Sequence, residues 1–202
     1  MPNPDTSQLE AVNTMLALIG ATAVSSLSNQ TSEDVVLAIR TLEEVNREVQ
    51  GLGWHWNTDL DQTITADADG RHAWQDDWFR FDPLPGVNPN IDVRREGDFL
   101  HDRRTGSNVF GSDGSSLKGD IVRYLGWTSI PETARGYIMK RAARIFLTRQ
   151  VGDETRAGYG IDDERRARLV MVEADTQQAD YSIFDTGVAP YVRHRPGGSG
   201  LR

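Results

Sequence analysis

The sequence predicts an α+β fold, in which a four-helix bundle of two N-terminal and two C-terminal helices carries an inserted small antiparallel β region. Apolar residues recur at three- and four-residue spacing near the N-terminus and again near the C-terminus, and these two observations predict the helices. A third predicts the strands, since alternating segments separated by turn-forming residues fill the middle. We expect the helical bundle over residues 1–53 and 128–186, the β region over 54–127, and an extended C-terminal tail over 187–202.

The composition limits the kinds of protein that the chain can be. With 202 residues it can form one domain with a substantial core. It has no cysteine, which excludes disulfides, thiolate metal ligands and cysteine nucleophiles, and no apolar run long enough to span a membrane. The net charge of −8 disfavours the wrapping of nucleic acid, because affinity there comes from neutralising phosphates. The same charge suits a surface past which DNA slides without sticking.

The two N-terminal helices have clear start and end signals. The first is expected over "TSQLEAVNTMLALIG", with Asp5 or Thr6 as its cap and Gly20 at its end. The second is expected over "SEDVVLAIRTLEEVNREVQG", where Ser32 or Thr31 caps the start and acidic residues occupy the first turn. Its apolar stripe consists of Val35, Ala38, Ile39, Leu42, Val45 and Val49.

Two glycines and two tryptophans mark the expected helix-to-sheet junction. Gly51 and Gly53 end the second helix and free the chain to turn. Alternation in the next segment predicts a strand that begins with Trp54 and Trp56 on one face. A buried strand that docks the helix and an aromatic surface that grips another molecule both fit this pattern. We expect the first, in which the two tryptophans seat the β region against the bundle.

Further strands are expected over "AWQDDWFRFDP", "NIDVRREGDFLHDR" and "KGDIVRYLGW", separated by turn segments such as "PLPGVNPN". Thr65, Asp67, Asp69, Gly70 and Asp76 fall on positions 1, 3, 5, 6 and 12 of a calcium-binding loop, of which position 6 is the turn glycine. The last ligand is aspartate in place of the usual glutamate, however, and a hairpin turn explains the Asp-Gly pair equally well. The four histidines have no ligand-like spacing, and nucleotide-binding, serine-hydrolase and zinc-protease motifs are absent. We expect no metal, no cofactor and no enzymatic activity.

Helical spacing returns over "IPETARGYIMKRAARIFLTRQVGD", with Pro131 at the first helical position, and again from about Ile161. Residues 131–150 contain five Lys or Arg residues and one Glu, a local charge of +4. This basic face either contacts an acidic partner or DNA, or pairs with the acidic residues that begin the fourth helix. We expect the pairing within the chain.

Three interpretations of the segment around residues 74–79 stay open, two for its aromatic residues and one for its aspartates. Trp74 and Trp78, followed by Phe79, are hard to place in a single small core, which favours an interface. Exposed tryptophans could instead stack on sugars, as in a carbohydrate-binding module. A hydrolase with an unrecognised carboxylate pair, such as Asp76 and Asp77, would need an acid with a perturbed pKa.

Four segments in the same order resemble the tail tubular protein A family of short-tailed bacteriophages. They are "LEAVNTMLALIGATAVSSL", "AIRTLEEVNREVQGLGWHWN", "IPETARGYIMKRAARIFLTRQVGD" and "EADTQQADYSIFD". The resemblance covers both pairs of expected helices, about two-thirds of the chain, and does not extend to the central β region. Neither a carbohydrate-binding module nor a hydrolase accounts for this order of helical segments.

The resemblance implies a structural virion protein without enzymatic activity. Family members form a dodecameric ring, the head-to-tail adaptor or gatekeeper between the portal protein and the tail nozzle (tail tubular protein B). Tail fibres are further partners, and genomic DNA passes through the lumen during ejection without sequence-specific binding. Such a protein is located in the virion tail and is assembled in the cytoplasm of the host bacterium. The candidate contacts with a neighbouring subunit or tail component are Trp74, Trp78 and Phe79, and the candidate portal-docking residues are Tyr191, Arg193, His194 and Arg195.

Overall fold

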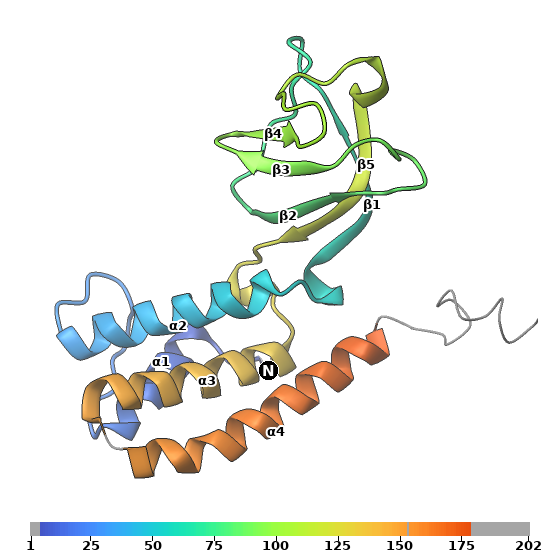
Figure 1. The fold of residues 1–202 in the computed structure, drawn as a ribbon. Coiled ribbons are helices and arrows are strands. Elements are labelled where there is room, and N and C mark those ends of the chain that lie inside the picture. The colour runs from blue at the N-terminus through green and yellow to red at the C-terminus, as the bar shows by residue number, and fades with distance from the viewer. Residues whose placement is uncertain (1–4, 153, 179–202) are drawn as a thin grey trace, which may run out of the picture.

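A computed structural model describes residues 5–152 and 154–178 and has helices at both ends of this part with strands between them (Figure 1). The helices are α1 (Gln8–Leu18), α2 (Glu33–Gly51), α3 (Glu132–Val151) and α4 (Glu154–Gln178). The strands are β1 (Thr58–Thr65), β2 (Trp78–Pro83), β3 (Val93–Glu96), β4 (Phe99–Asp102) and β5 (Ser116–Arg123). Short 3-10 turns are η1 (His55–Asn57), η2 (Ser112–Gly114) and η3 (Trp127–Ser129). The chain is therefore α+β, as the sequence predicts.

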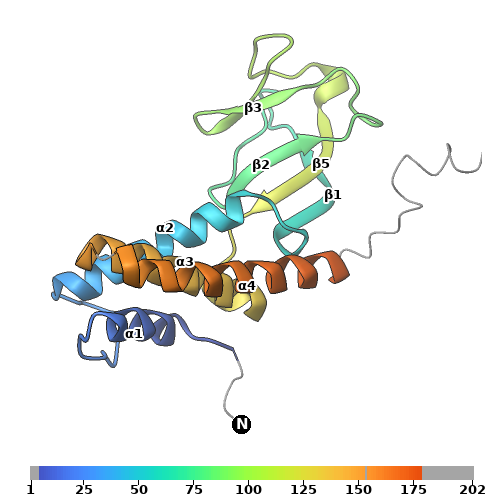
Figure 2. The same ribbon diagram turned by 60° about the horizontal axis from the view of Figure 1, so that its bottom comes forward.

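The helices pack in a layer below the strands (Figures 1 and 2). Helices α1, α2 and α3 contact one another, whereas α4 packs along α3 and against η1. The expected four-helix bundle is thus not confirmed as an arrangement, although the helices share one apolar core. In α2 the predicted stripe is buried except for Ile39, which is half-buried at the edge of the core. Representative core residues are Val12, Leu16, Leu42, Ile138, Phe146 and Met171.

The strands form two small antiparallel sheets with a core of their own. One sheet has the order β1-β5-β2, and the other is the β3–β4 hairpin. The pairing of β1 with β5 shifts register between Asp59 and Gln62, where Asp61 adopts a φ of 58°. This is the geometry of a β-bulge, which twists an edge strand. The buried residues of this second core are Trp78, Phe81, Leu100, Phe110, Leu117 and Ile121.

Several predicted helix starts differ from the structure. Ser7, and not Asp5 or Thr6, caps α1 through a reciprocal capping box with Glu10. Pro131 is the N-cap of α3 and precedes its first helical residue. Gly20 has the predicted left-handed φ, 75°, just beyond the end of α1. Ser7 lies one residue after Thr6 and two after Asp5, and its side chain accepts from the Glu10 N–H at 3.1 Å, which fixes the start of α1.

The start of α4 differs more. The sequence predicts it near Ile161, but the helix begins at Glu154, directly after Gly152 ends α3 with a left-handed φ of 65°. Gly158 and Gly160 make the segment between these positions a poor helix by intrinsic propensity. Packing along α3 overrides that propensity. None of the helices in the described part of the chain is long and apolar enough to cross a membrane.

Gly119 offers a test of the packing between β5 and β2. A Cβ atom at this buried position would lie 2.7 Å from the Phe81 ring and would also meet the carbonyl oxygen of Asp82. We expect Gly119→Ala to lower the free energy of unfolding by about 1–3 kcal/mol, because β2 must move to admit the methyl group. Urea titration followed by tryptophan fluorescence measures this change. The matched control is Gly86→Ala, since a Cβ at Gly86 meets no atom within 4 Å; equal stability of the two variants would contradict the prediction.

Candidate functional site

The helical layer and the β region are joined by two short segments, one after α2 and one before α3. The side chain of Gln50, fully buried near the end of α2, bridges them. Its Nε2 donates to the carbonyl oxygen of Leu125 at 3.0 Å, and its Oε1 accepts from the Leu125 N–H at 2.7 Å. Nε2 also donates to Oδ1 of Asn46, one turn earlier, at 2.9 Å. The Gln50 side chain thus satisfies both backbone hydrogen-bonding groups of Leu125, as a neighbouring strand would.

Asn57 makes the matching connection from the first segment. Its buried Nδ2 donates to the carbonyl oxygens of Gln50 at 2.9 Å and of Arg123, the last residue of β5, at 2.8 Å. Its Oδ1 accepts from the Trp54 N–H at 2.7 Å. We call Asn46, Gln50 and Asn57 the amide clamp. Gln50 and Asn57 bind backbone groups on both sides of the junction, and Asn46 joins Gln50 to the Tyr124 hydroxyl. The clamp therefore fixes the angle between the helices and the sheet.

Gly53 lets the chain turn at the clamp. It has a φ of 78°, and a Cβ there would lie 3.0 Å from Nη2 of Arg80 and 3.1 Å from Val122. The predicted role of Gly53 in turning the chain therefore has both a conformational and a steric reason. Gly51 is the last residue of α2, and a Cβ at this position would lie 3.8 Å from the Phe79 ring.

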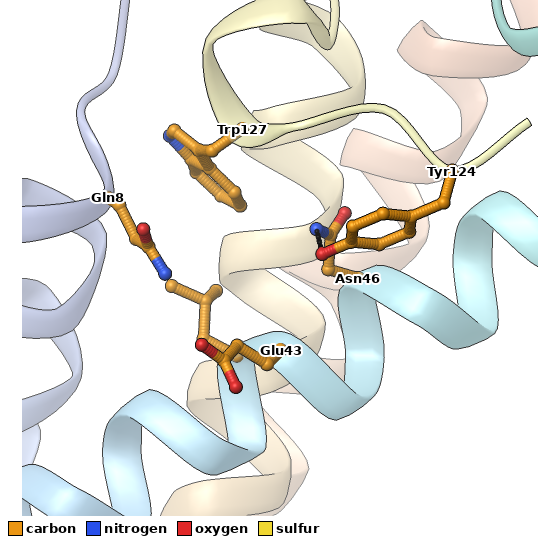
Figure 3. A pocket seen from close by; sticks show the side chains of 6 residues that line it. Gln8, Glu43, Asn46, Tyr124 and Trp127 are labelled. Carbon is orange, nitrogen blue, oxygen red and sulfur yellow. Dashed lines mark hydrogen bonds between the residues drawn. The ribbon is translucent and has the colours of Figure 1, made fainter. Parts of the chain in front are cut away.

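A cavity of about 130 Å³ lies beside the clamp, between α1, α2 and the segment that leads to η3 (Figure 3). Asn46 and Tyr124 lie side by side in its lining, and Nδ2 of Asn46 donates to the Tyr124 hydroxyl at 3.2 Å (Figure 3). Nε1 of Trp127 donates to the carbonyl oxygen of Thr6 at 2.8 Å and so fastens the chain before α1. The lining residues are Gln8, Leu42, Glu43, Asn46, Tyr124 and Trp127.

Trp54 and Trp56 lie on the helical side of this junction. The segment that contains them is not the start of a strand, as predicted, but the turn η1 and its N-cap. Both rings pack against the helical core, and Nε1 of Trp54 donates to the carbonyl oxygen of Val49 at 2.7 Å. The N–H of Trp56 lies 3.4 Å from Oδ1 of Asp175 on α4. The alternation of Trp54 and Trp56 led to the wrong prediction of a strand, because a tight 3-10 turn also places both rings against the same core.

Trp74, Trp78 and Phe79 do not form one exposed patch. Trp78 is 7% exposed in the β core, stacked on Phe81 and edge-on to Trp74 with ring centroids 5.7 Å apart. Trp74 is half-buried against the same core, and the Arg95 guanidinium lies 5.3 Å from its ring centroid. Phe79 is half-buried edge-on to Tyr124 at the junction. The internal contacts of Trp78 leave little of its ring for a sugar or for a neighbouring subunit.

The residues considered for metal or acid chemistry have other contacts. Asp67 stabilises a turn, one of the two interpretations of this segment: its carboxylate accepts from the N–H groups of Asp69 and Arg71. The Arg71 guanidinium also binds Asp69 at 2.6 Å. The Asp77 carboxylate binds Nη1 of Arg123 at 2.7 Å. Among residues 5–152 and 154–178, no group of three or more His, Asp or Glu side chains is placed to hold a metal ion.

Three arginines of the basic face of α3 are paired within the chain, with carboxylates of α4, as expected, and also of α2. Glu164 of α4 accepts from Nη1 of Arg141 at 2.8 Å and from Nε of Arg144 at 2.5 Å. The expected acidic start of α4 therefore supplies one carboxylate. The others come from α2, where Glu48 binds Arg141 at 2.6 Å and Glu44 binds Arg149 at 2.8 Å.

Sequence reasoning missed the amide clamp. Asn46 and Gln50 are four residues apart beside the apolar stripe of α2, the spacing at which two side chains meet on a helix. That spacing is a usable signal, because polar residues inside a helix seam must find a partner. The expected docking residues Tyr191, Arg193, His194 and Arg195 lie outside the residues that the structure describes.

Comparison with known proteins gives one family. The family model described as tail tubular protein matches residues 9–181, which include every helix and strand except the first residue of α1. A search among curated proteins finds no match.

The clamp predicts a specific loss of stability. In Gln50→Leu a side chain of similar size leaves both backbone groups of Leu125 without their partner. We expect a decrease of about 1–3 kcal/mol in the free energy of unfolding. Gln75→Leu, at an exposed position, is the control. Urea titrations of both variants measure the difference; a Gln50→Leu protein as stable as the control would show that the clamp contributes nothing.

Glu164 predicts a pH dependence. Burial opposes its ionisation, but hydrogen bonds from Arg144 and Arg141 outweigh burial and lower the pKa of the carboxyl below its ordinary value. Its contribution to stability is therefore complete above the ordinary titration range of glutamate, about pH 4–5, and is lost as the pH falls through the lowered pKa. We expect Glu164→Gln to flatten the decline in unfolding free energy between about pH 6 and pH 3. Glu173→Gln, exposed on α4, should keep the wild-type slope; identical slopes for both variants would contradict the prediction.

Proposed function

The chain belongs to the tail tubular protein family, and from this membership we propose that it forms the head-to-tail adaptor ring of a short-tailed bacteriophage. Membership itself makes the chain a structural protein of a phage tail and a component of the virion. The proposal adds a dodecameric ring between the portal protein and the tail nozzle, with tail fibres as further partners and DNA passing through the lumen.

The observation that carries the proposal is the extent of the family match. Residues 9–181 include the helical layer, both junction segments and the whole β region, so the match is not confined to one common element such as a helix pair. The amide clamp adds physical support. A subunit whose two parts are held at a fixed angle suits a ring that must keep its shape while DNA passes through it.

The distribution of charge also supports a DNA conduit. The chain carries a net charge of −8, and Arg141, Arg144 and Arg149 of its most basic helix are bound to Glu44, Glu48 and Glu164 of the same chain. Cations already paired with carboxylates attract phosphates weakly. A lumen built from such subunits would let DNA move without retaining it.

The portal-docking role stays with the C-terminal tail, residues 187–202. Its basic residues Arg193, His194 and Arg195, with Tyr191, form a short peptide of the kind that binds an extended groove on a partner. This part of the proposal rests on the sequence alone. The junction residues Gly51, Gly53, Trp54 and Trp56 have a structural role in the proposal, which is to seat the β region on the helices.

Native mass spectrometry of the full chain, alone and mixed with the portal and nozzle proteins of the same phage, tests the proposal. We expect a dodecamer, formed alone or on the portal, that also binds the nozzle protein. Deletion of residues 187–202 should abolish portal binding and leave the circular dichroism spectrum and thermal unfolding of the remaining chain unchanged. A full chain that stays monomeric in the presence of both partners would refute the adaptor assignment.

A further inference from the structure

Helix α4 presents an unusual outer side. Ile161 and Leu169 are 47% and 60% exposed, although large aliphatic side chains on a helix normally face the core. Arg165 and Arg168 lie between them, and at 100° per residue the four positions span an arc of about 100°. We call these four residues the α4 face. Three of them, Ile161, Arg165 and Arg168, also line a shallow groove of about 410 Å³ with Arg144 of α3 and Glu164.

The arginines of this face are not committed to the fold. Arg168 has no ion-pair or hydrogen-bond partner among the described residues, and Arg165 lies 3.8 Å from Asp162 with both side chains at least 70% exposed. An exposed pair at this distance contributes little to stability. By contrast, Arg141 and Arg144 share the half-buried Glu164. The α4 face therefore combines exposed aliphatic carbon with positive charge that is free to bind elsewhere.

A surface of the opposite character lies on β1. Leu60 is 54% exposed and stands between Asp59 and Asp61, and the side chain of Asp120 accepts from the Asp61 N–H at 3.0 Å. We call Leu60, Asp61 and Asp120 the β1 face; Asp59 is paired with the buried Ile121 and lies on the other side of the sheet. Asp82 is directly opposite Asp120 across β2 and β5, which adds a further carboxylate and an unfavourable like-charge pair.

One cation reduces but does not cancel this negative charge: Lys118 lies 3.3 Å from Asp61. Arg123 binds Asp59 at 2.5 Å and also binds Asp77, on the other side of the sheet. The surface thus presents an exposed leucine among carboxylates, whereas the α4 face presents an exposed leucine among arginines. Such charge complementarity selects partners and fixes register.

The two faces belong to different parts of the molecule. Helix α4 belongs to the helical layer, and β1 is an edge strand of the sheet, which lies beyond α2 (Figure 1). One chain can therefore use both faces at once, each with a different neighbour. Contacts between two unlike surfaces are heterologous, and they close into a ring when successive rotations add to a full turn.

We propose that the α4 face of one copy packs against the β1 face of the next copy. The inference rests on the proposed ring and names the contact that builds it. The contact is made by side chains and not by strand addition, because the bulge at Asp61 interrupts the regular hydrogen-bonding edge of β1. Leu60 packs on Leu169 and Ile161, and Arg165 and Arg168 bind Asp61 and Asp120.

The absence of cysteine from the chain makes a cross-linking test clean. The full chain carrying Leu60→Cys and Leu169→Cys is treated with a short bismaleimide, both free and in assembled phage tails. We expect a ladder of dimers, trimers and larger species. The control replaces Leu60→Cys by Val109→Cys, at a position that is equally exposed in the β region, and should give no ladder.

Charge reversal provides a second readout. Arg168→Glu should reduce the ladder and the ring observed by native mass spectrometry, whereas Arg166→Glu, which lies off the face on the same helix, should change neither. Rings that form without a cross-link between the two cysteines would overturn the contact and leave the adaptor assignment intact. A chain that forms no ring even with its portal would overturn both.

Discussion

The architecture depends on the amide clamp, because it is the polar connection that fixes the sheet to the helices where two separate cores meet. Each core is closed by its own apolar residues, so burial of apolar surface does not by itself set the angle between them. The buried amides of Gln50 and Asn57 set it, since their hydrogen bonds are directional and run to backbone groups in both connecting segments. Leaving such groups unpaired is costly, which makes the observed angle the favourable one.

Much of this fold could be predicted from the sequence, and the failures have common causes. The α2 stripe and the left-handed Gly20 and Gly53 follow from local periodicity and glycine conformation, and the structure has them as expected. The strand expected at Trp54 and the late start of α4 were wrong because tertiary packing decided both: a 3-10 turn serves the helical core, and α3 holds a glycine-containing turn of helix. Local propensity is a weak guide wherever another element covers the segment.

The site was harder to predict than the fold. The closely spaced aromatic residues predict an interface, whereas in the structure Trp78 is part of a core and Phe79 packs at the junction. The amides that make the junction carry no motif, and their partners in the second connecting segment are 66 to 78 residues away along the chain. The ion pairs of α3 were expected with α4, but two of their carboxylates come from α2, since the sequence does not say which helices are neighbours. Long-range pairings of this kind become visible only in the folded chain.

The clamp and the proposed contact between copies bear on each other. A contact that joins the helical part of one copy to the β region of the next passes through the junction of every subunit. Any variation in the helix-to-sheet angle would then be repeated at each step around the ring, and a ring closes only if the successive rotations sum to a full turn. Loosening the junction would leave each copy folded and both faces intact, yet it would favour open or irregular assemblies. A rigid, hydrogen-bonded junction is therefore what a heterologous ring of these subunits requires, and an apolar junction without directional bonds would not supply it.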